Sequence, residues 1–239
     1  MNPEEVHVLQ QSSWKNQSIL RHLDDDELAF LEQSAEITHY KKNEIIFLQG
    51  KRIGGCYVVL SGIVKQFKTG AEGKNYILRL AKPFEILGYR SVLSNESACN
   101  TSIAIEDSAV YYIPKDCLHH LVKTNGNFAL DLLQIACREL EESHLLITEI
   151  AQKSVKERLA ELLLTLKNKF GVNENGQLNV TLSRDEYASI VGTATESVIR
   201  LLSEFKTERY IDVNGKKITI MNEKALERMA ASIVYAANN

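Results

Sequence analysis

The sequence has few of the features that define several common classes of protein. Its 239 residues include three prolines and 12 glycines, too few for a collagen-like or Pro/Gly-rich low-complexity chain. No run approaches the ~18 apolar residues of a membrane-spanning helix, and residues 1–20 have no apolar core of the signal-peptide kind. We therefore expect a globular, cytoplasmic protein with no membrane partner.

Metal-binding and catalytic motifs are also missing. The four cysteines stand alone at positions 56, 99, 117 and 137, so there is no CxxC pair for a zinc ribbon or a compact iron–sulfur site. Buried, apolar thiols in a reducing compartment are the expectation. No GxxxxGK[ST], HExxH or GxSxG motif occurs. The sequence thus predicts no catalytic residue, metal site or resident cofactor. An enzyme is therefore kept only as an alternative that no motif supports.

Charge of either sign is not in large excess, but it is unevenly distributed. The net charge is −3. Residues 1–152 hold 15 Lys and Arg against 20 Asp and Glu, a balance of −5, and residues 153–239 hold 13 against 11, a balance of +2. This mild asymmetry permits DNA binding by the C-terminal part without demanding it.

The hydrophobic pattern changes along the chain. Residues 16–35 have the spacing of short amphipathic helices, and residues 36–113 carry short apolar or alternating runs between glycine and polar turns. Strands at such regular spacing are typical of an all-β barrel, sandwich or jelly roll. After a helix over 153–170 that ends near Gly171, residues 178–182 are predicted to form a short strand.

Residues 128–151 contain no glycine or proline and predict one long helix. Apolar positions alternate by three and four residues, which is the spacing of a heptad seam. Phe128, Leu132 and Ile135 form a second stripe that can pack on the β domain. The seam can meet a partner helix, and burial within the chain is the alternative. We call the following residues the seam: Leu130, Leu133, Cys137, Leu140, His144 and Ile147.

Residues 183–220 carry the pattern of a winged helix. Ser183 to Glu186 is a capping box, Gly192 is placed to end the helix that follows, and Thr193 to Glu196 is predicted to be a second capping box. Two short helices joined by a tight glycine turn form a helix-turn-helix. Asn214-Gly215 then predicts a hairpin with a type I′ turn, which would be the wing.

The outer face of the second helix carries residues suited to DNA. We call this surface the reading face; it consists of Thr195, Glu196, Ser197 and Arg200. Arginine pairs with guanine O6 and N7, glutamate accepts from cytosine N4, and hydroxyl groups contact bases or phosphates. A solvated polar helix face is the alternative, which the two-domain context makes the weaker one.

Two segments, residues 49–62 and 182–200, resemble the CRP/FNR superfamily of bacterial transcription regulators, and the resemblance extends over nearly the whole chain. It implies an α+β fold with a cyclic-nucleotide-binding-type β jelly roll over 1–127, a dimerisation helix over 128–152 and a winged helix-turn-helix over 153–239. It also implies a homodimeric, sequence-specific regulator that binds an inverted repeat in double-stranded DNA, with RNA polymerase as a further partner. The β domain would sense a signal.

The resemblance assigns roles to individual residues at the DNA interface. Glu196 and Arg200 match the family's base-reading positions, and Ser197 matches a hydroxyl used on the DNA backbone. Thr195 stands where cyclic-AMP-type regulators carry an arginine, which leaves the operator sequence open. Two further residues, Ser183 and Arg184, match positions near the phosphates. From its place at the hairpin tip we expect Lys216 to meet a phosphate as well.

The resemblance is weaker at the effector site, where the matching residues are Gly88, Tyr89, Arg90, Ser91 and Cys99. Tyr89 replaces the glutamate that binds ribose in cyclic-AMP-binding relatives, and Ala98-Cys99 stands where they carry the Arg-Ser pair for phosphate. We therefore expect that cyclic AMP is not the effector, unless Arg90 or Arg79 replaces the missing arginine.

The β domain could in principle hold an iron–sulfur cluster or a haem, and each needs particular ligands. An iron–sulfur cluster of the FNR type is not expected, because no cysteine precedes residue 56. A haem sensor needs axial ligands, for which the candidate histidines are His39, His119, His120 and His144, although histidines are more often structural. Another small molecule is the alternative effector. The sequence leaves open the effector, the target genes and the choice between activation and repression.

Overall fold

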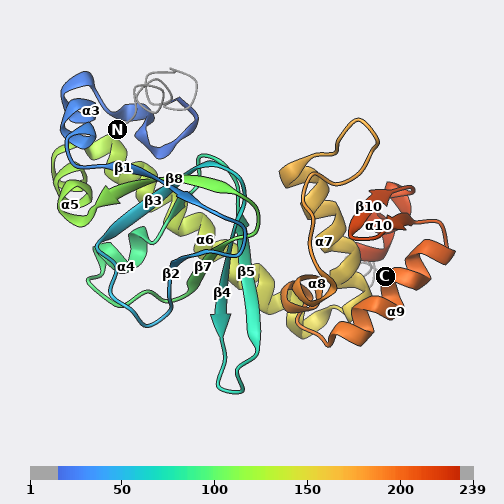
Figure 1. Cartoon of the computed structure of the whole chain (residues 1–239). Helices are drawn as coiled ribbons and strands as arrows, with labels where there is room; N and C mark the ends of the chain where they lie inside the picture. The colour runs from blue at the N-terminus through green and yellow to red at the C-terminus, as the bar shows by residue number, and fades with distance from the viewer. Residues whose placement is uncertain (1–15, 232–239) are drawn as a thin grey trace, which may run out of the picture. The chain divides into compact units, whose positions relative to one another are not determined.

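The computed structural model describes residues 16–231, so residues 1–15 and 232–239 of the two predicted terminal domains lie outside the described part. The chain divides into two compact units, residues 1–140 and 141–239, called here the N-terminal and C-terminal units (Figure 1). Each is described by itself. No helix of the described part is long and apolar enough to cross a membrane.

The N-terminal unit is built around two four-stranded sheets, in the orders β1-β8-β3-β6 and β2-β7-β4-β5. All neighbouring strands pair antiparallel. Consecutive strands alternate between the sheets in places, which is the jelly-roll arrangement expected from the sequence. The strands are β1 (Glu36–Tyr40), β2 (Ile45–Phe47), β3 (Gly55–Ser61), β4 (Val64–Thr69), β5 (Asn75–Ala81), β6 (Ile86–Leu87), β7 (Thr101–Ala104) and β8 (Ser108–Pro114).

Two of the four cysteines lie in the core of this unit. Val58 and Val59 on β3 are fully buried, and Cys56 on the same strand lies in the core with Cys117. Burial raises the pKa of the Cys56 thiol to about 12, which keeps it protonated and inert. The expectation of buried thiols is confirmed for these two and wrong for Cys99 and Cys137, which are exposed.

Helices cover the β-roll. They are the 3₁₀ helix η1 (Ile19–His22), α3 (Asp25–Glu32), α4 (Tyr89–Leu93), α5 (Lys115–Thr124) and the first part of α6 (Gly126–Gln152). Phe128 and Leu132 of α6 are buried and Ile135 is partly buried in the same core cluster, as the second stripe predicted. The sequence reading missed α4 and α5. α4 has only five residues, and it starts after Gly88, whose φ of 77° needs glycine.

The C-terminal unit contains α7 (Val155–Phe170), α8 (Arg184–Val191), α9 (Thr195–Thr207), β9 (Ile211–Asn214), β10 (Lys217–Ile220) and α10 (Glu223–Ala230). Ser154 and Glu157 form a capping box at the start of α7, and Gly171 ends the helix as predicted. The predicted strand 178–182 is wrong. Leu178 and Leu182 are buried, which explains the apolar alternation, but the backbone here makes only isolated bridges, from Leu178 to Val172 and from the preceding Gln177 to Thr219.

Candidate nucleic-acid interface and effector region

α8 and α9 form the predicted helix-turn-helix. The Ser183 side chain accepts from the Glu186 N–H and the Glu186 carboxylate accepts from the Ser183 N–H, which confirms the first capping box. Gly192 then ends α8 with φ 73° and ψ 53°, a left-handed conformation that favours glycine. This turn allows α9 to start three residues later and fixes its direction relative to α8.

The predicted second capping box, Thr193 to Glu196, is absent. α9 is preceded by Ala194 at the N-cap position, and no side chain caps it. Thr195 is the first residue of the helix, so its hydroxyl is placed to reach α8 instead, where it donates to Asp185 Oδ1 at 2.7 Å. The Thr195 side chain therefore ties the two helices together from within the reading face.

The two faces of α9 differ sharply. Val198, Leu201, Leu202 and Phe205 are buried and hold the helix against the unit. Glu196 and Arg200 are exposed on the other side, and Ser197 is half-buried between the two faces. Within the described residues neither Glu196 nor Arg200 forms an ion pair. The structure thus presents two opposite charges, four residues apart, to the solvent.

The hairpin that follows is the predicted wing, with a different turn. Asn214 pairs with Lys217, so Gly215 and Lys216 are the two turn residues. Of these only Gly215 has a positive φ, of 60°, which fits a type II′ turn, whereas the predicted type I′ turn needs two positive values. The pairing register therefore corrects the predicted turn by one residue. Lys216 is exposed at the tip.

The wing is attached to both helices of the motif. Lys206 at the end of α9 donates to the Val213 carbonyl at 2.7 Å and pairs with Asp212 at 3.1 Å. Arg184 at the start of α8 donates through Nη2 to the Gly215 carbonyl at 3.0 Å. Arg184 and Ser183, predicted near the phosphates, thus both have structural partners within the unit, a cap for Ser183 and the wing for Arg184.

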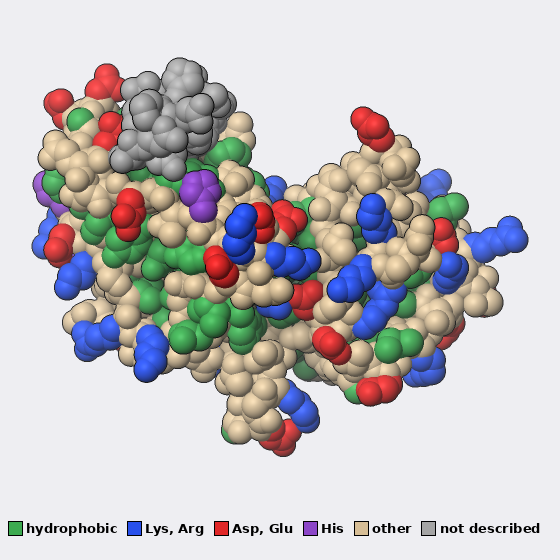
Figure 2. All heavy atoms as spheres, in the orientation of Figure 1, with side chains coloured by type: hydrophobic (Ala, Val, Ile, Leu, Met, Phe, Trp, Pro, Cys, Tyr) green, Lys and Arg blue, Asp and Glu red, His purple; other side chains and the backbone are tan. Residues whose placement is uncertain are grey.

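Charges on the C-terminal unit are mixed. Figure 2 shows Lys and Arg side chains spread over the visible face of this unit, with Asp and Glu side chains among them. This agrees with the small positive balance of the C-terminal residues. Any preference for a particular DNA sequence therefore depends on where individual side chains stand, and less on a broad basic patch.

The predicted effector residues do not form one cavity. Tyr89 is 3% exposed and its hydroxyl donates to Glu139 Oε2 of α6 at 3.2 Å. Arg90 Nη2 contacts Cys99 Sγ at 3.2 Å, and Arg90 Nε lies 3.8 Å from Glu139 Oε2. Ser91 instead lines a hollow beside α5. Gly88 supplies only the left-handed turn before α4.

Arg79 adds to the contacts around Glu139. Its guanidinium pairs with Glu85 at 2.6 Å and also with Glu139, so it joins β5, the loop before β6 and α6. The three side chains are only 16–23% exposed. Burial, and then the charge of Glu139, raise the pKa of Tyr89, so this phenol stays protonated and donates to the carboxylate. The group Arg79, Glu85, Tyr89, Arg90 and Glu139 is called the Glu139 cluster.

The predicted seam lies on α6, is called the α6 seam from this point, and faces solvent in the single chain. Leu130, Leu133, Leu140 and Ile147 are 51%, 60%, 56% and 66% exposed, and Cys137 and His144 are also exposed. The alternative of burial within the chain is therefore wrong for these residues. An exposed row of large apolar side chains is unusual on a protein surface unless another surface covers it.

The end of α6 is joined to α7 and α8 by polar contacts. Arg158 on α7 donates to the carbonyls of Lys153 at 2.6 Å and Val191 at 2.9 Å. Lys153 pairs with Glu161 and lies 3.5 Å from Glu149. Burial and the nearby Glu161 raise the pKa of Glu149, and Lys153 partly offsets the rise.

No group of three or more His, Cys, Asp or Glu side chains that could hold a metal ion occurs in residues 16–231. The four histidines considered as haem ligands lie on separate elements: His39 on β1, His119 and His120 on α5, and His144 on α6. His120 contacts the ring of Phe30, with centroids 4.7 Å apart.

Two family models match the chain, one to each unit. Residues 37–125 match the cyclic nucleotide-binding domain, and residues 157–229 match the Crp-like helix-turn-helix domain. The second match includes α8, α9 and the wing. Together with the fold and the exposed face of α9, the matches define a transcription regulator with a helix-turn-helix DNA-binding domain.

Curated relatives and solved structures agree. The chain is 24% identical to the CRP-like cAMP-activated global transcriptional regulator of Mycobacterium tuberculosis over 89% of this chain and 96% of that protein. It is 28% identical to the transcriptional activator protein Anr of Pseudomonas protegens over 81% of this chain and 80% of that protein. The structure of FixK2 from Bradyrhizobium japonicum has the same fold, with a TM-score of 0.73, 23% identity and coverage of 82% and 96%. The chain belongs to the CRP/FNR superfamily, whose members found here are regulators and not enzymes.

Several residues that shape these sites were not found from the sequence. Glu139, Lys206 and Arg158 act through partners that are 5 to 60 residues away in the chain. Such contacts leave no local pattern of spacing. Glu139 does sit off the seam on α6, but nothing in its neighbourhood distinguishes it from the other glutamates of that helix.

Proposed function

We propose that the protein acts as a homodimer that binds an inverted-repeat operator through two copies of α9. The observation that carries this proposal is the exposed pair Glu196 and Arg200 on a helix whose other face is buried. Both side-chain types can read base edges in the major groove. A two-fold dimer would place two such helices in successive major grooves, with half-sites ~10 bp apart.

The α6 seam supports the dimer. Its large apolar side chains lie on one face of a helix that has no other covering in the described chain. Burial against a second copy would remove this surface from water, and each fully buried leucine stabilises by roughly 1.5–3 kcal/mol. The heptad spacing is that of two helices packed side by side. A second copy of the chain therefore satisfies the seam without any further partner.

The β-roll would sense the signal, and we propose that cyclic AMP is not that signal. Both arginines near the site, Arg79 and Arg90, already lie next to the Glu139 carboxylate. Ala98, at the position matched to the phosphate-binding arginine, is 3% exposed and offers no charge. A buried phosphate without a cationic partner is costly. The Mycobacterium tuberculosis relative is named for activation by cAMP, so this proposal separates the chain from that relative.

The proposal includes no iron–sulfur cluster and no other resident cofactor. It does include RNA polymerase as a partner, since regulators of transcription act on that enzyme or on its access to DNA. The effector would be a small molecule of another kind. Its binding would shift the balance between two arrangements of the DNA-binding units.

Selection from a random DNA library tests the DNA part. Full-length protein is expected to enrich an inverted repeat whose half-sites are about one helical turn apart, detected by sequencing and confirmed by gel shift. Competition with unrelated DNA of equal length controls for contacts with phosphates alone. Recovery of sequences with no shared half-site would contradict sequence-specific binding.

Titration calorimetry with cyclic AMP and cyclic GMP tests the effector part. We expect no saturable heat at micromolar ligand and no change in operator affinity. The same titration on the variant Glu139→Gln tests whether the carboxylate beside Arg79 and Arg90 keeps these arginines from a phosphate. Glu141→Gln is the matched control at an exposed site of the same helix. If wild type binds cyclic AMP in the low micromolar range, the proposal is wrong. Mass spectrometry of gently purified protein would reveal a retained effector.

A further inference from the structure

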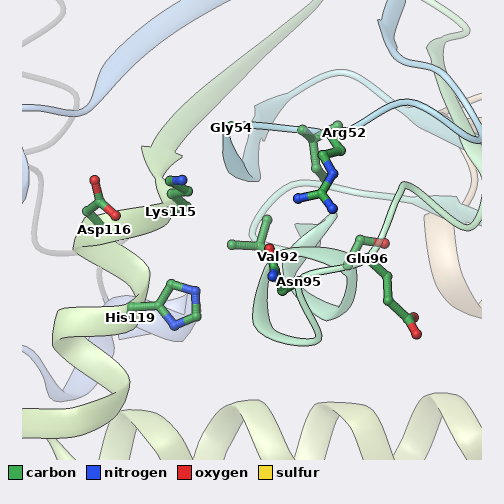
Figure 3. A pocket seen from close by; sticks show the side chains of 10 residues that line it. Arg52, Gly54, Val92, Asn95, Glu96, Lys115, Asp116 and His119 are labelled. Atoms are coloured by element: carbon green, nitrogen blue, oxygen red, sulfur yellow. The ribbon is translucent and has the colours of Figure 1, made fainter.

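A hollow lies in the N-terminal unit, between the β2–β3 connection, α4 and the first two turns of α5 (Figure 3). Its volume is about 470 Å³, which is within the usual range of sites for small molecules, roughly 300–1,000 Å³. Its lining does not include Tyr89, Arg90 or Cys99. The hollow is therefore separate from the Glu139 cluster.

Three basic side chains, one from the β2–β3 connection and two from α5, line the hollow. Arg52 comes from the β2–β3 connection, Lys115 begins α5, and His119 lies one turn further along α5. None of the three forms an ion pair within the described residues. Figure 3 shows the Arg52 guanidinium and the His119 ring directed into the hollow. They are therefore placed to contact a bound group together.

Acidic residues also line the rim, but they are turned outward. In Figure 3 the Glu96 side chain extends away from Arg52, and Asp116 lies on the far side of α5 from Asn95. Glu96 accepts a hydrogen bond from Ser94 at 3.3 Å. The Arg52 guanidinium thus points into the hollow while these two carboxylates do not, and its positive charge favours a bound anion.

Neutral donors and a fixed frame complete the site. Ser91 and Asn95 line the same hollow, and Ile53 and Val92 supply apolar wall. The first turn of α5 has no side-chain cap, and Asp116 places a carboxylate in that turn. The Lys115 N–H donates to the Gly54 carbonyl at 2.8 Å, which holds α5 against the β2–β3 connection. A site held in place before binding loses less free energy to ordering.

We propose that this hollow binds a small organic molecule that carries a phosphoryl group. The forked guanidinium of Arg52 can donate to two phosphoryl oxygens, and Lys115 supplies a second positive charge. Ser91 and Asn95 donate to the remaining polar groups. The apolar wall and the volume suit an organic part of about the size of a nucleoside, so a free phosphate ion would leave most of the hollow unfilled. This site does not depend on the DNA-binding proposal.

Titration calorimetry on the full-length protein tests it with three probes: inorganic phosphate, pyrophosphate and adenosine 5′-monophosphate. We expect saturable binding of the monophosphate, at least tenfold tighter than that of inorganic phosphate. Arg52→Ala should weaken it at least tenfold. Lys51→Ala removes the same charge from the neighbouring exposed residue and should leave the affinity unchanged. Both side chains are on the surface, so neither change should disturb folding.

Three outcomes would overturn the proposal. The first is that none of the probes binds saturably up to millimolar concentration. The second is that Arg52→Ala and Lys51→Ala weaken binding equally, which would mean attraction to general surface charge. The third is that Arg90→Ala abolishes binding and Arg52→Ala does not, which would place the ligand at the Glu139 cluster. Tighter binding of pyrophosphate than of the monophosphate would support the phosphoryl site and remove the role of the organic part.

Discussion

The reading face of α9 and the Glu139 cluster use similar side chains in opposite ways. Glu196 and Arg200 stand in solvent and form no ion pair within the described chain, whereas Arg79 is enclosed between two carboxylates. Charged groups without a partner on a rigid surface are ready for an external one. Charged groups that already pair with each other stabilise the fold and resist a competing ligand. The partners of the arginines, and not their number, therefore identify a binding site.

Leu140→Asp is the change with the largest expected effect, because it should separate the two copies of the chain and, with them, their two reading faces. A charge in the α6 seam opposes burial of that seam, so the protein should become monomeric and operator affinity should fall at least 100-fold. Analytical ultracentrifugation and gel shifts measure both. Leu145→Asp is the control, because Leu145 is equally exposed, at 53%, but lies outside the seam. A wild-type protein that is monomeric at micromolar concentration would contradict the seam assignment.

Arg79→Ala tests the enclosed half of the comparison. It removes the cation that the partly buried Glu85 and Glu139 share, while Arg90 stays 3.8 Å from Glu139. We expect a loss of about 2–3 kcal/mol of stability, below the ~3–5 kcal/mol of fully buried pairs. For a unit of this size that lowers Tm by roughly 5–10 °C. Differential scanning calorimetry measures the shift. Lys68→Ala on β4 removes an exposed charge and serves as the control. A Tm equal to that of wild type would mean that the cluster does not stabilise the unit.

Arg200→Ala tests the exposed half. Because Arg200 forms no ion pair within residues 16–231, its loss should leave Tm unchanged and cost ~1–3 kcal/mol on the best operator, with weaker preference at one base position. Fluorescence anisotropy on operator variants measures this. Lys224→Ala removes an exposed charge from α10 and should change neither quantity. Equal losses on operator and random DNA would mean that Arg200 contacts only phosphates.

Lys216→Ala should show the pattern opposite to that of Arg200→Ala. At the tip of the wing its charge is expected to meet a phosphate, so binding to all sequences should weaken alike. The slope of log affinity against log salt concentration should fall by ~1. Titrations at several salt concentrations measure the slope. A loss confined to one operator sequence would assign the wing to base reading instead.

Glu149→Gln is the smallest of these effects. The raised pKa of Glu149 means that its ionised form is disfavoured in the folded protein. Its contribution to stability is therefore present below the unfolded-state pKa and is lost as pH rises through the folded-state pKa. At pH 7–8 the variant should have a Tm about 1–3 °C above wild type, and near pH 4 the difference should vanish. Thermal melts at both pH values measure it, and a variant less stable than wild type at pH 8 would contradict the sign.

The parts of the fold that the sequence predicted were those with local rules. The Ser183 capping box, the glycine stop at Gly192 and the apolar stripes of α6 depend on residues within a few positions of one another, and all three are present. The second capping box failed because Thr195 begins the helix and pairs with Asp185. The hairpin turn was misplaced by one residue because pairing of Asn214 with Lys217 decides it, and a two-residue motif cannot report the register.

For the candidate sites too, positions set by a local pattern were predicted and positions set by distant contacts were not. Glu196 and Arg200 were predicted from their place on a helix, and the structure puts both in solvent; their contact with DNA stays a prediction. The effector residues could not be resolved from the sequence. Tyr89 and Ser91 are two residues apart, yet one points to Glu139 and the other to the hollow beside α5. The short helix α4 sends them in different directions, and nothing local predicted that helix.

The unbroken course of α6 has a consequence for the evolution of the chain. Its 27 residues cross the boundary between the two units at residue 140 without interruption, over a length of about 40 Å. A helix transmits rotation as well as distance, since each residue turns the chain by about 100°. One inserted residue after position 140 would therefore rotate everything downstream by more than a quarter turn, whereas seven would nearly restore the original angle. The connector can lengthen by heptads and not by single residues.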